Sequence, residues 1–372
     1  MTQEEYRAAA EDAVYLAACM VNGEQPDGGR VGRMDLDRLY RTADCHLLTG
    51  IVGCALEAAG VRDPAFVQAR SKAVRRTVLF DTERAAVLAE LEKSGIWHMP
   101  LKGCVLKDCY PQIGMRQMAD NDILFDGTRA DEVRAVMERL GFTAEHFGMG
   151  VHDSYFKLPV CNFEMHRALF APVPGDAVSG YYRDIRSRML QDEGSSFRYH
   201  LSPEDFYVYM IAHEHKHYQS SGTGLRSLLD TYVYLKKMGA RLDFGLIAAE
   251  LEKLGLSGFE RQNRELSLRL FSCEALTPGD EAMFLYMLES GTYGIRKHSV
   301  QNQVARKGRW GYLWSRAFLP FAQMKTLYPV LSVLPPLLPL CWVLRLATAF
   351  LFKRELMLYQ LRAAFGRPDC ET

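Results

Sequence analysis

The sequence predicts an α+β fold in which a small mixed sheet lies between two mainly helical regions. Apolar residues recur at helical spacing through the first part of the 372-residue chain. Short apolar runs alternate with one clear helix in the middle, and helical spacing then returns. We therefore expect an N-terminal helical region at 1–95, an α+β core at 96–200 and a C-terminal helical region at 201–372.

The N-terminal region is predicted to be helical in three stretches. Helical spacing extends through Tyr6–Val21, Leu36–Ala59 and Phe66–Leu91, and Gly60 and Gly95 are stop signals after the last two. The opening residues are acidic and polar, so we expect no signal peptide. The nine cysteines include no Cys-x-x-Cys pair, which favours a reducing, cytoplasmic compartment over a disulfide framework or a structural zinc site.

The central region combines strand-like and helical patterns. One helix is predicted at Ala130–Leu140, and Gly141 closes it. Strands are predicted at the short apolar runs Ile96–Leu101, Ile123–Phe125, Tyr155–Val160 and Cys161–Met165.

An acidic pair, Asp120 and Asp122, opens the second of these strands. Residues two apart on a strand point to the same side, so the two carboxylates should lie together, with Asn121 on the opposite face. Divalent cations commonly hold such a pair in place, and two-metal phosphoryl transfer requires carboxylates that bridge ions about 3.5–4 Å apart.

A third carboxylate is needed to complete a site of this kind, and Glu164 is the best candidate. Alternation along 161–166 places Glu164 on one face with Asn162 and His166, while the opposite face is apolar. His166 is equally well explained as a functional group or as a hydrogen-bonded histidine of the sheet. The prediction is that Asp120, Asp122 and Glu164 converge and bind two Mg²⁺ ions.

These residues resemble a known family in their order along the chain. The similar elements are Leu101-Lys102-Gly103, Tyr110-Pro111, Arg116, the Asp120/Asp122 pair, Glu164-Met165-His166, His213, Lys216-His217, Gly224-Leu225-Arg226 and Asp230. Together they resemble the bacterial uncharacterised nucleotidyltransferase family, of the DNA polymerase β-like superfamily, over residues 35–240. The core at 96–200 should then have the nucleotidyltransferase fold.

The resemblance implies a Mg²⁺-dependent enzyme that moves a nucleotidyl group from an NTP to an acceptor that the sequence does not identify. It implies that Gly103 lies at the phosphate turn, with Lys102 or Arg116 orienting the phosphates. The sequence departs from the family at Asn121, where an apolar residue is usual, and at Cys104, where Ser or Gly is usual. A catalytically degenerate scaffold therefore remains as an alternative.

The C-terminal helices carry a competing motif. Ser202-Pro203 starts a predicted helix that contains His213-Glu214-His215-Lys216-His217, which fits the zinc-peptidase pattern His-Glu-x-x-His. The nucleotidyltransferase resemblance explains the same histidines without requiring Glu214. It implies instead an acceptor pocket lined by His166, His213, His217, Arg226 and Asp230.

Charge is distributed unevenly along a chain whose net charge is zero. Residues 290–354 carry ten basic residues and no acidic one, which leaves a balance of −10 elsewhere. Such a segment favours an anionic partner, and between Lys325 and Arg345 it is uncharged, apolar and interrupted by prolines. Contact with the inner membrane face and burial as an irregular stretch both remain open. Nucleic-acid binding is less favoured, because aliphatic rather than aromatic residues separate the cations.

Overall fold

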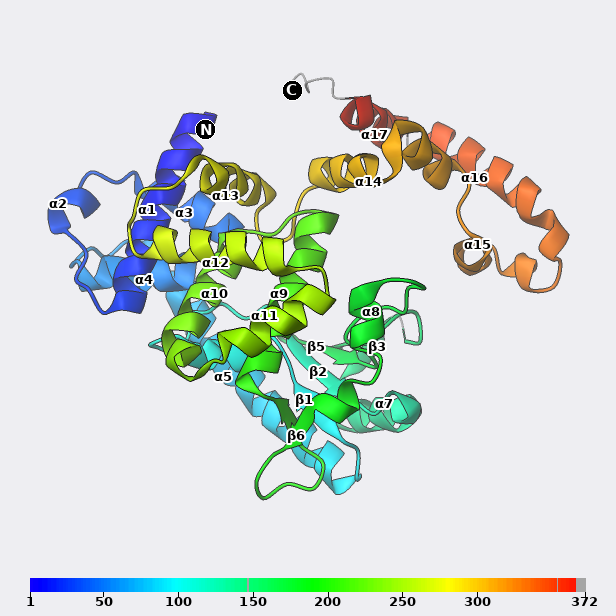
Figure 1. The fold of residues 1–372 in the computed structure, drawn as a ribbon, viewed down its shortest axis with the longest axis horizontal. Coiled ribbons are helices and arrows are strands. Elements are labelled where there is room, and N and C mark those ends of the chain that lie inside the picture. The colour runs from blue at the N-terminus through cyan, green and yellow to red at the C-terminus, as the bar shows by residue number, and fades with distance from the viewer. Residues whose placement is uncertain (146, 353, 366–372) are drawn as a thin grey trace. The chain divides into compact units, whose positions relative to one another are not determined.

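The computed structural model describes residues 1–145, 147–352 and 354–365 (Figure 1). The helices are α1 Gln3–Asn22, α2 Gly28–Val31, α3 Leu36–Cys45, α4 Thr49–Ala58, α5 Pro64–Lys93, α6 Gly103–Leu106, α7 Ala130–Arg139, α8 Ala177–Tyr181, α9 Pro203–Ser220, α10 Leu225–Met238, α11 Phe244–Lys253, α12 Ser257–Phe271, α13 Pro278–Ser290, α14 Arg296–Ala317, α15 Phe321–Leu327, α16 Leu338–Phe352 and α17 Arg354–Phe365. The strands are β1 His98–Pro100, β2 Asn121–Phe125, β3 Thr143–Glu145, β4 His152–Lys157, β5 Cys161–His166, β6 Met189–Gln191 and β7 Tyr199–Leu201. The predicted α+β class is confirmed.

The chain forms two compact units. The first unit comprises Met1–His215 and Gly224–Leu288, and the second comprises Lys216–Thr223 and Glu289–Thr372. All the strands of the described residues lie in the first unit, between His98 and Leu201. The three regions predicted from the sequence were divided by secondary-structure type. The two units are divided by which segments pack together, so their boundaries differ from those of the predicted regions.

The N-terminal helices begin at residues that satisfy their first backbone N–H groups. Asp63 accepts hydrogen bonds from the N–H groups of Ala65 and Phe66, and Pro64 is the first residue of the 30-residue helix α5. The stretch predicted at Leu36–Ala59 is two helices, α3 and α4. Leu47, between them, has a left-handed φ of 53°, which a continuous helix does not allow.

The main sheet has the strand order β1-β2-β5-β4-β3. Strands β2 and β5 are parallel, whereas β1 with β2, β4 with β5 and β3 with β4 are antiparallel. Because β5 joins β2 in parallel, residues 42 positions apart in sequence become direct neighbours in the middle of the sheet. Strands β6 and β7 form a separate two-stranded sheet.

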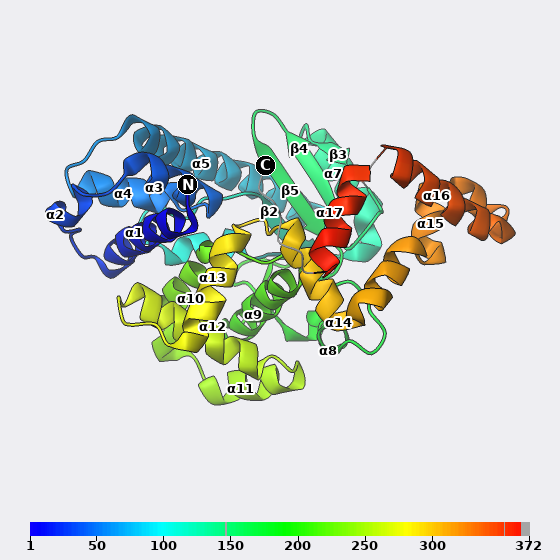
Figure 2. The same cartoon turned by 90° about the horizontal axis from the view of Figure 1, so that it is seen from above.

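Each face of the main sheet contributes to its own core. Ile123, Phe125 and Phe163 pack with Phe80 and Val87 of α5 and with residues of α7. On the other face, Leu124 of β2 packs in a second core with residues of α9, α10 and α11. Figure 2 shows helices α9–α12 gathered together, with α1 lying beside α12. Alternation along β2 therefore places Asn121 on the face covered by α5 and α7, and Asp122 on the face covered by α9–α11.

The second unit is helical where it is described. Helix α14 is kinked at Gly308, whose φ of 70° is not helical. Helix α15 ends at Leu327, two residues before Pro329, and Pro335 begins a short 3₁₀ turn at Pro335–Leu337 before α16. The prolines therefore interrupt the apolar run, as predicted. Two small clusters of buried residues stabilise this unit: Val300, Tyr312 and Ala364, and Met324, Leu331 and Cys341.

Candidate active site

The sheet register brings together the acids singled out in the sequence. Asp122 and Glu164 are direct partners across the parallel β2–β5 pair, so their side chains leave the same face. Asp120 lies two residues before Asp122, just outside the strand. Asp122 is buried, and Asp120 and Glu164 are partly exposed. Three carboxylates therefore converge on one face of the sheet.

Two cationic groups contact the most buried of these acids. The Nζ atom of Lys102 lies 2.7 Å from Oδ1 of Asp122, and Nε2 of His166 lies 2.8 Å from the same oxygen. The same His166 nitrogen is 3.5 Å from Oε2 of Glu164. One carboxylate oxygen thus receives two donors, which together compensate its charge in a dry environment.

The pKa values show how unequal the three acids are. Burial, together with the charges of Asp122 and Glu164, raises the pKa of Asp120 to about 7. Burial would also raise the pKa of Asp122, but Lys102 and His166 hold it well below its usual range. Burial likewise opposes ionisation of Glu164, yet the hydrogen bond from His166 keeps its pKa below the usual value. Asp120 is therefore the acid whose ionised form its surroundings stabilise least.

Lys102 reaches Asp122 from a turn with an unusual backbone. Its φ of 45° and ψ of −116° match the first central position of a type II′ turn, where glycine is normal. The turn is closed by a hydrogen bond from the N–H of Cys104 to the carbonyl of Leu101. A strained non-glycine residue of this kind often marks a functional position. Here the strain places an ammonium group against Asp122.

Gly103 follows in the turn and is closely covered by a buried ion pair. A Cβ atom at Gly103 would lie 2.6 Å from Nη1 of Arg116 and 3.2 Å from Cε of Met118. Arg116 in turn binds Asp230 of α10 through two contacts, Nε to Oδ1 at 2.8 Å and Nη2 to Oδ2 at 2.9 Å. Tyr110 donates a third hydrogen bond to Asp230. The guanidinium that was predicted to orient phosphates is thus bound to Asp230 and packs over the turn.

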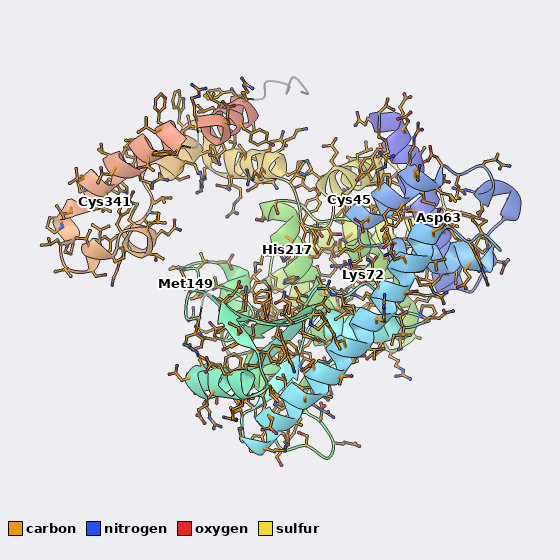
Figure 3. All side chains as sticks on the ribbon, turned by 180° about the vertical axis from the view of Figure 1, so that it is seen from behind. Cys45, Asp63, Lys72, Met149, His217 and Cys341 are labelled. Atoms are coloured by element: carbon orange, nitrogen blue, oxygen red, sulfur yellow. The ribbon has the colours of Figure 1, made fainter. Side chains whose placement is uncertain are left out.

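The residues predicted to line an acceptor pocket lie in different surroundings. Nη1 of Arg226 donates to the carbonyl of Gln117, and its charge lowers the pKa of nearby Asp120, although burial dominates there. The ring of His213 lies 6.0 Å from that of Tyr209 on α9. His217, labelled in Figure 3, belongs to the second unit.

Glu214, the acid of the zinc-peptidase motif, is buried in the helical core of the first unit. Its Oε1 accepts a hydrogen bond from Nδ2 of Asn263 on α12 at 2.8 Å. Burial raises its pKa to about 7. Within the described residues, no group of three metal-binding side chains includes His213 or His217. The structure therefore gives the peptidase hypothesis no support.

The two departures from the family pattern have a local explanation. Asn121 faces away from the acids, as predicted, and its Oδ1 accepts a hydrogen bond from Nη1 of Arg84 on α5 at 2.9 Å. Its Nδ2 donates to the carbonyl of Phe80. Cys104 is buried, with its Sγ 3.5 Å from Oδ1 of Asn121. Asn121 therefore finds its hydrogen-bond partners in helix α5 and in the Cys104 thiol, on the face of the sheet opposite the acids.

One residue of the site was not predicted from the sequence. His152 pairs with His166 across the antiparallel β4–β5 ladder, and their ring centroids are 5.0 Å apart. Its Nε2 lies 3.7 Å from Oε1 of Glu164. The strand was predicted at Tyr155–Val160, whereas β4 begins three residues earlier at His152, so neither the strand position of His152 nor its pairing with 161–166 was visible in the sequence.

A small mixed sheet with three convergent carboxylates beside a Lys-Gly turn, flanked by helices, defines a nucleotidyltransferase-like core. The chain belongs to the family described as uncharacterised nucleotidyltransferases, whose model matches residues 32–272. No curated protein and no solved structure matches the chain.

Proposed function

We propose that this protein is a Mg²⁺-dependent enzyme that transfers a nucleotidyl group from an NTP to an acceptor hydroxyl. The observation that carries the proposal is the direct pairing of Asp122 with Glu164 across parallel strands, with Asp120 two residues earlier. Family membership supports the same class of reaction.

The acids fit a hard divalent cation. Mg²⁺ prefers oxygen ligands, and carboxylates of Asp120, Asp122 and Glu164 supply them from two neighbouring strands. Burial and the charges of the other two acids raise the pKa of Asp120, so a bound cation would favour its ionised form. We therefore assign these three residues as the metal ligands, with two ions as the expected number.

Bound Mg²⁺ would neutralise phosphate charge and stabilise both the attacking and the leaving oxygen. Lys102 then exchanges its bond with Asp122 for one to the triphosphate, which its flexible side chain permits. The backbone of Gly103 is proposed to contact the phosphates, and the absence of a side chain leaves room for Arg116 and Met118 on the covered side of the turn. The Arg116–Asp230 pair, packed over Gly103, holds this turn in position.

In the transfer itself, the acceptor oxygen forms a bond to the α-phosphorus of the NTP while pyrophosphate leaves. Glu164, partly exposed beside Asp122, takes the proton of the acceptor hydroxyl. His213 and Arg226, on α9 and α10 of the first unit, are proposed to face the acceptor, together with His166. A protein hydroxyl, a small molecule and an RNA end all remain as acceptors.

The test is incubation of the full chain with each α-labelled NTP and Mg²⁺, with a panel of acceptors and with the protein alone. Asp122→Asn and Glu164→Gln are compared with Glu145→Gln, which changes an exposed acid on β3 of the same sheet. Circular dichroism checks that all variants fold. We expect the two site variants to lose roughly 10²-fold or more in rate, in line with other groups that stabilise transition-state charge.

Two results would contradict the proposal. If wild type neither binds nor consumes any NTP in a Mg²⁺-dependent way, the catalytically degenerate scaffold becomes the better description. If Glu145→Gln loses as much activity as Glu164→Gln, the assignment of the site on this face of β5 is wrong.

A further inference from the structure

The acid site has a second set of potential metal ligands at its β4 side: His152, Glu164 and His166. Their ligand atoms all lie within 4.8 Å of one another. The arrangement follows from register, because His152 and His166 face each other across β4–β5 and Glu164 is two residues before His166 on the same side. All three residues lie on paired strands of the sheet, so the backbone hydrogen bonds hold their positions.

The separations suit a small metal ion. Two ligands that each lie about 2.1 Å from a tetrahedral ion are about 3.4 Å apart. Nε2 of His166 lies 3.5 Å from Oε2 of Glu164, and Nε2 of His152 lies 3.7 Å from its Oε1. Oδ1 of Asp122, 2.8 Å from Nε2 of His166, is within reach as a fourth ligand. Small side-chain movements would be needed, and Nε2 of His166 would release the proton that it donates to Asp122 in the metal-free protein.

The ligand chemistry separates this subsite from a Mg²⁺ site. Imidazole nitrogen is a good ligand for Co²⁺, Ni²⁺ and Zn²⁺, and Mn²⁺ binds it more readily than Mg²⁺, which takes oxygen. We propose that His152, Glu164 and His166 form a nitrogen-containing subsite for a transition-metal dication, sharing Glu164 with the carboxylate site. Its part in catalysis rests on the proposed function, whereas its metal binding does not.

The experiment uses Mn²⁺ alone with the full chain, without nucleotide. Electron paramagnetic resonance follows the titration, and electron spin-echo modulation detects ¹⁴N coupled to the bound Mn²⁺. His152→Asn is compared with His200→Asn, because His200 on β7 is an exposed histidine bound to Asp192. Thermal melts check that the variants fold. We expect His152→Asn to fold because the His152 side chain is partly exposed.

We expect ¹⁴N modulation in wild type and in His200→Asn. In His152→Asn the modulation should weaken and Mn²⁺ affinity should fall about 10-fold or more. Bound Mn²⁺ without ¹⁴N coupling, or equal affinity in His152→Asn, would overturn the inference. Nitrogen-coupled Mn²⁺ in a protein that turns over no NTP would sustain this inference while the proposed function fails, and the reverse result would do the opposite.

A second inference concerns helix α16 in the second unit, and it rests on independent observations. Pro335–Phe352 is long and apolar enough by composition to cross a membrane, yet only 6% of this window is buried. Val343, Phe350 and Leu351 are 63%, 58% and 71% exposed. A buried core helix would pass the same test of composition, but this helix is not buried.

The exposed surface of α16 is largely uncharged, and exposed basic residues lie on the other helices of the same unit. Arg345, the one charged residue of α16, donates to the backbone carbonyls of Arg316 and Ala317 at the end of α14. Those carbonyls are a helix C-terminus, which favours a cation. Exposed basic residues lie on α14 and α15, among them Arg306, Lys307 and Lys325. No acidic residue occurs in 290–354 to compete for them.

We infer that α16 binds the surface of an anionic bilayer. Only 15 of the 18 residues of the window Pro335–Phe352 belong to the α-helix, which is about 22 Å long, whereas a hydrocarbon core is about 30 Å thick. We therefore place the helix in the interface instead of across the bilayer. Apolar side chains enter the headgroup boundary while the basic residues attract anionic headgroups. Charge complementarity selects the bilayer over an apolar protein partner.

Flotation of the full chain with liposomes of phosphatidylcholine alone, or with 30% phosphatidylglycerol by design, tests this inference at low and high salt. We expect binding to the anionic vesicles at low salt, several-fold less at high salt, and loss of binding in Val343→Glu with Leu351→Glu. Leu246→Glu, an exposed apolar position on α11, is the control and should bind normally.

The inference fails if wild type does not float with anionic vesicles at low salt. It also fails if wild type forms a concentration-dependent dimer without lipid that the α16 substitutions abolish, since a second copy would then be the occupant of this face. Sedimentation velocity measures that outcome directly.

Discussion

Arg116 and Asp230 form a buried, two-contact ion pair beside the candidate site. Both side chains are less than 10% exposed and are joined by two parallel contacts. Removing one partner of such a pair leaves an uncompensated buried charge, which typically costs about 3–5 kcal/mol. The pair therefore connects α10 to the Gly103 turn, because Arg116 both binds Asp230 and packs over Gly103.

We expect Asp230→Ala to lower the free energy of unfolding by about 3–5 kcal/mol in urea titrations. The double variant Arg116→Met with Asp230→Leu should recover most of that loss, because it removes both charges. Glu138→Ala, which breaks the exposed Arg134–Glu138 pair on α7, should cost less than about 1 kcal/mol. Equal losses in Asp230→Ala and Glu138→Ala would show that the first pair is not buried as described.

Glu214 gives stability a pH dependence. Burial raises its pKa from 4.5 in the unfolded chain to about 7 in the fold. Below pH 4.5 the carboxyl is protonated in both states and has no effect. As pH rises to about 7, the unfolded state loses its proton first, so the folded state becomes less stable, by about 3 kcal/mol at full ionisation.

Glu214→Gln should therefore match wild type near pH 4.5 and be more stable than it at pH 8. The measurement is the melting temperature of both proteins across this range, with Glu252→Gln, an exposed position on α11, as the control. A difference between wild type and Glu214→Gln that does not change with pH would disprove the assignment to this carboxyl.

At the scale of elements, the type II′ turn between β1 and α6 determines where Lys102 lies. The left-handed backbone at Lys102 costs about 1–3 kcal/mol in a non-glycine residue. The bond from its ammonium to Asp122 compensates that cost, and any replacement loses this bond. Strain and ion pair can be separated by comparing two replacements.

Lys102→Gly should be more stable than Lys102→Ala by about 1–2 kcal/mol, although glycine elsewhere lowers stability relative to alanine. Both variants should lose nucleotidyl transfer. Urea titration of the two variants gives the difference. Gly258 on α12, where an added Cβ meets nothing within 4 Å, is the control: there Ala should be at least as stable as Gly. Should alanine be the more stable residue at position 102 as well, the turn is not left-handed in solution.

At the scale of the whole molecule, thiol exposure reports on packing in both units. The cysteines of the described residues are free; Cys45 and Cys273 are exposed, and Cys19, Cys54, Cys104, Cys161 and Cys341 are buried. Burial also raises the pKa of Cys104 to about 11, which leaves little reactive thiolate.

We expect iodoacetamide to label Cys45 and Cys273 within minutes in the native protein, with the five buried thiols labelled only in urea. Peptide mass spectrometry assigns the sites, and added reductant should not change the melting temperature. Labelling of Cys104 as fast as Cys45 would mean that the core between α5 and the sheet opens readily. Rapid labelling of Cys341 alone would locate the opening in the second unit.

The sequence by itself determined the local features of this protein. Period-two alternation placed Asp120 with Asp122 and Glu164 with His166, because side-chain direction on a strand depends only on the backbone. Helical spacing, caps and prolines gave α1, α5, α7 and the interruption before α16. The order of the motifs indicated the family, which the family model confirms.

Tertiary structure decided which local features meet. The sequence does not show that β5 pairs with β2 in parallel and with β4 on its other side. The convergence of Asp122 and Glu164 was therefore predicted without knowledge of the strand pairing that produces it, and His152 was not predicted. The same holds for Arg116, which binds Asp230, 114 positions away. Pairing between distant segments is chosen by the joint burial of both sheet faces, a property of the folded chain that no local pattern contains.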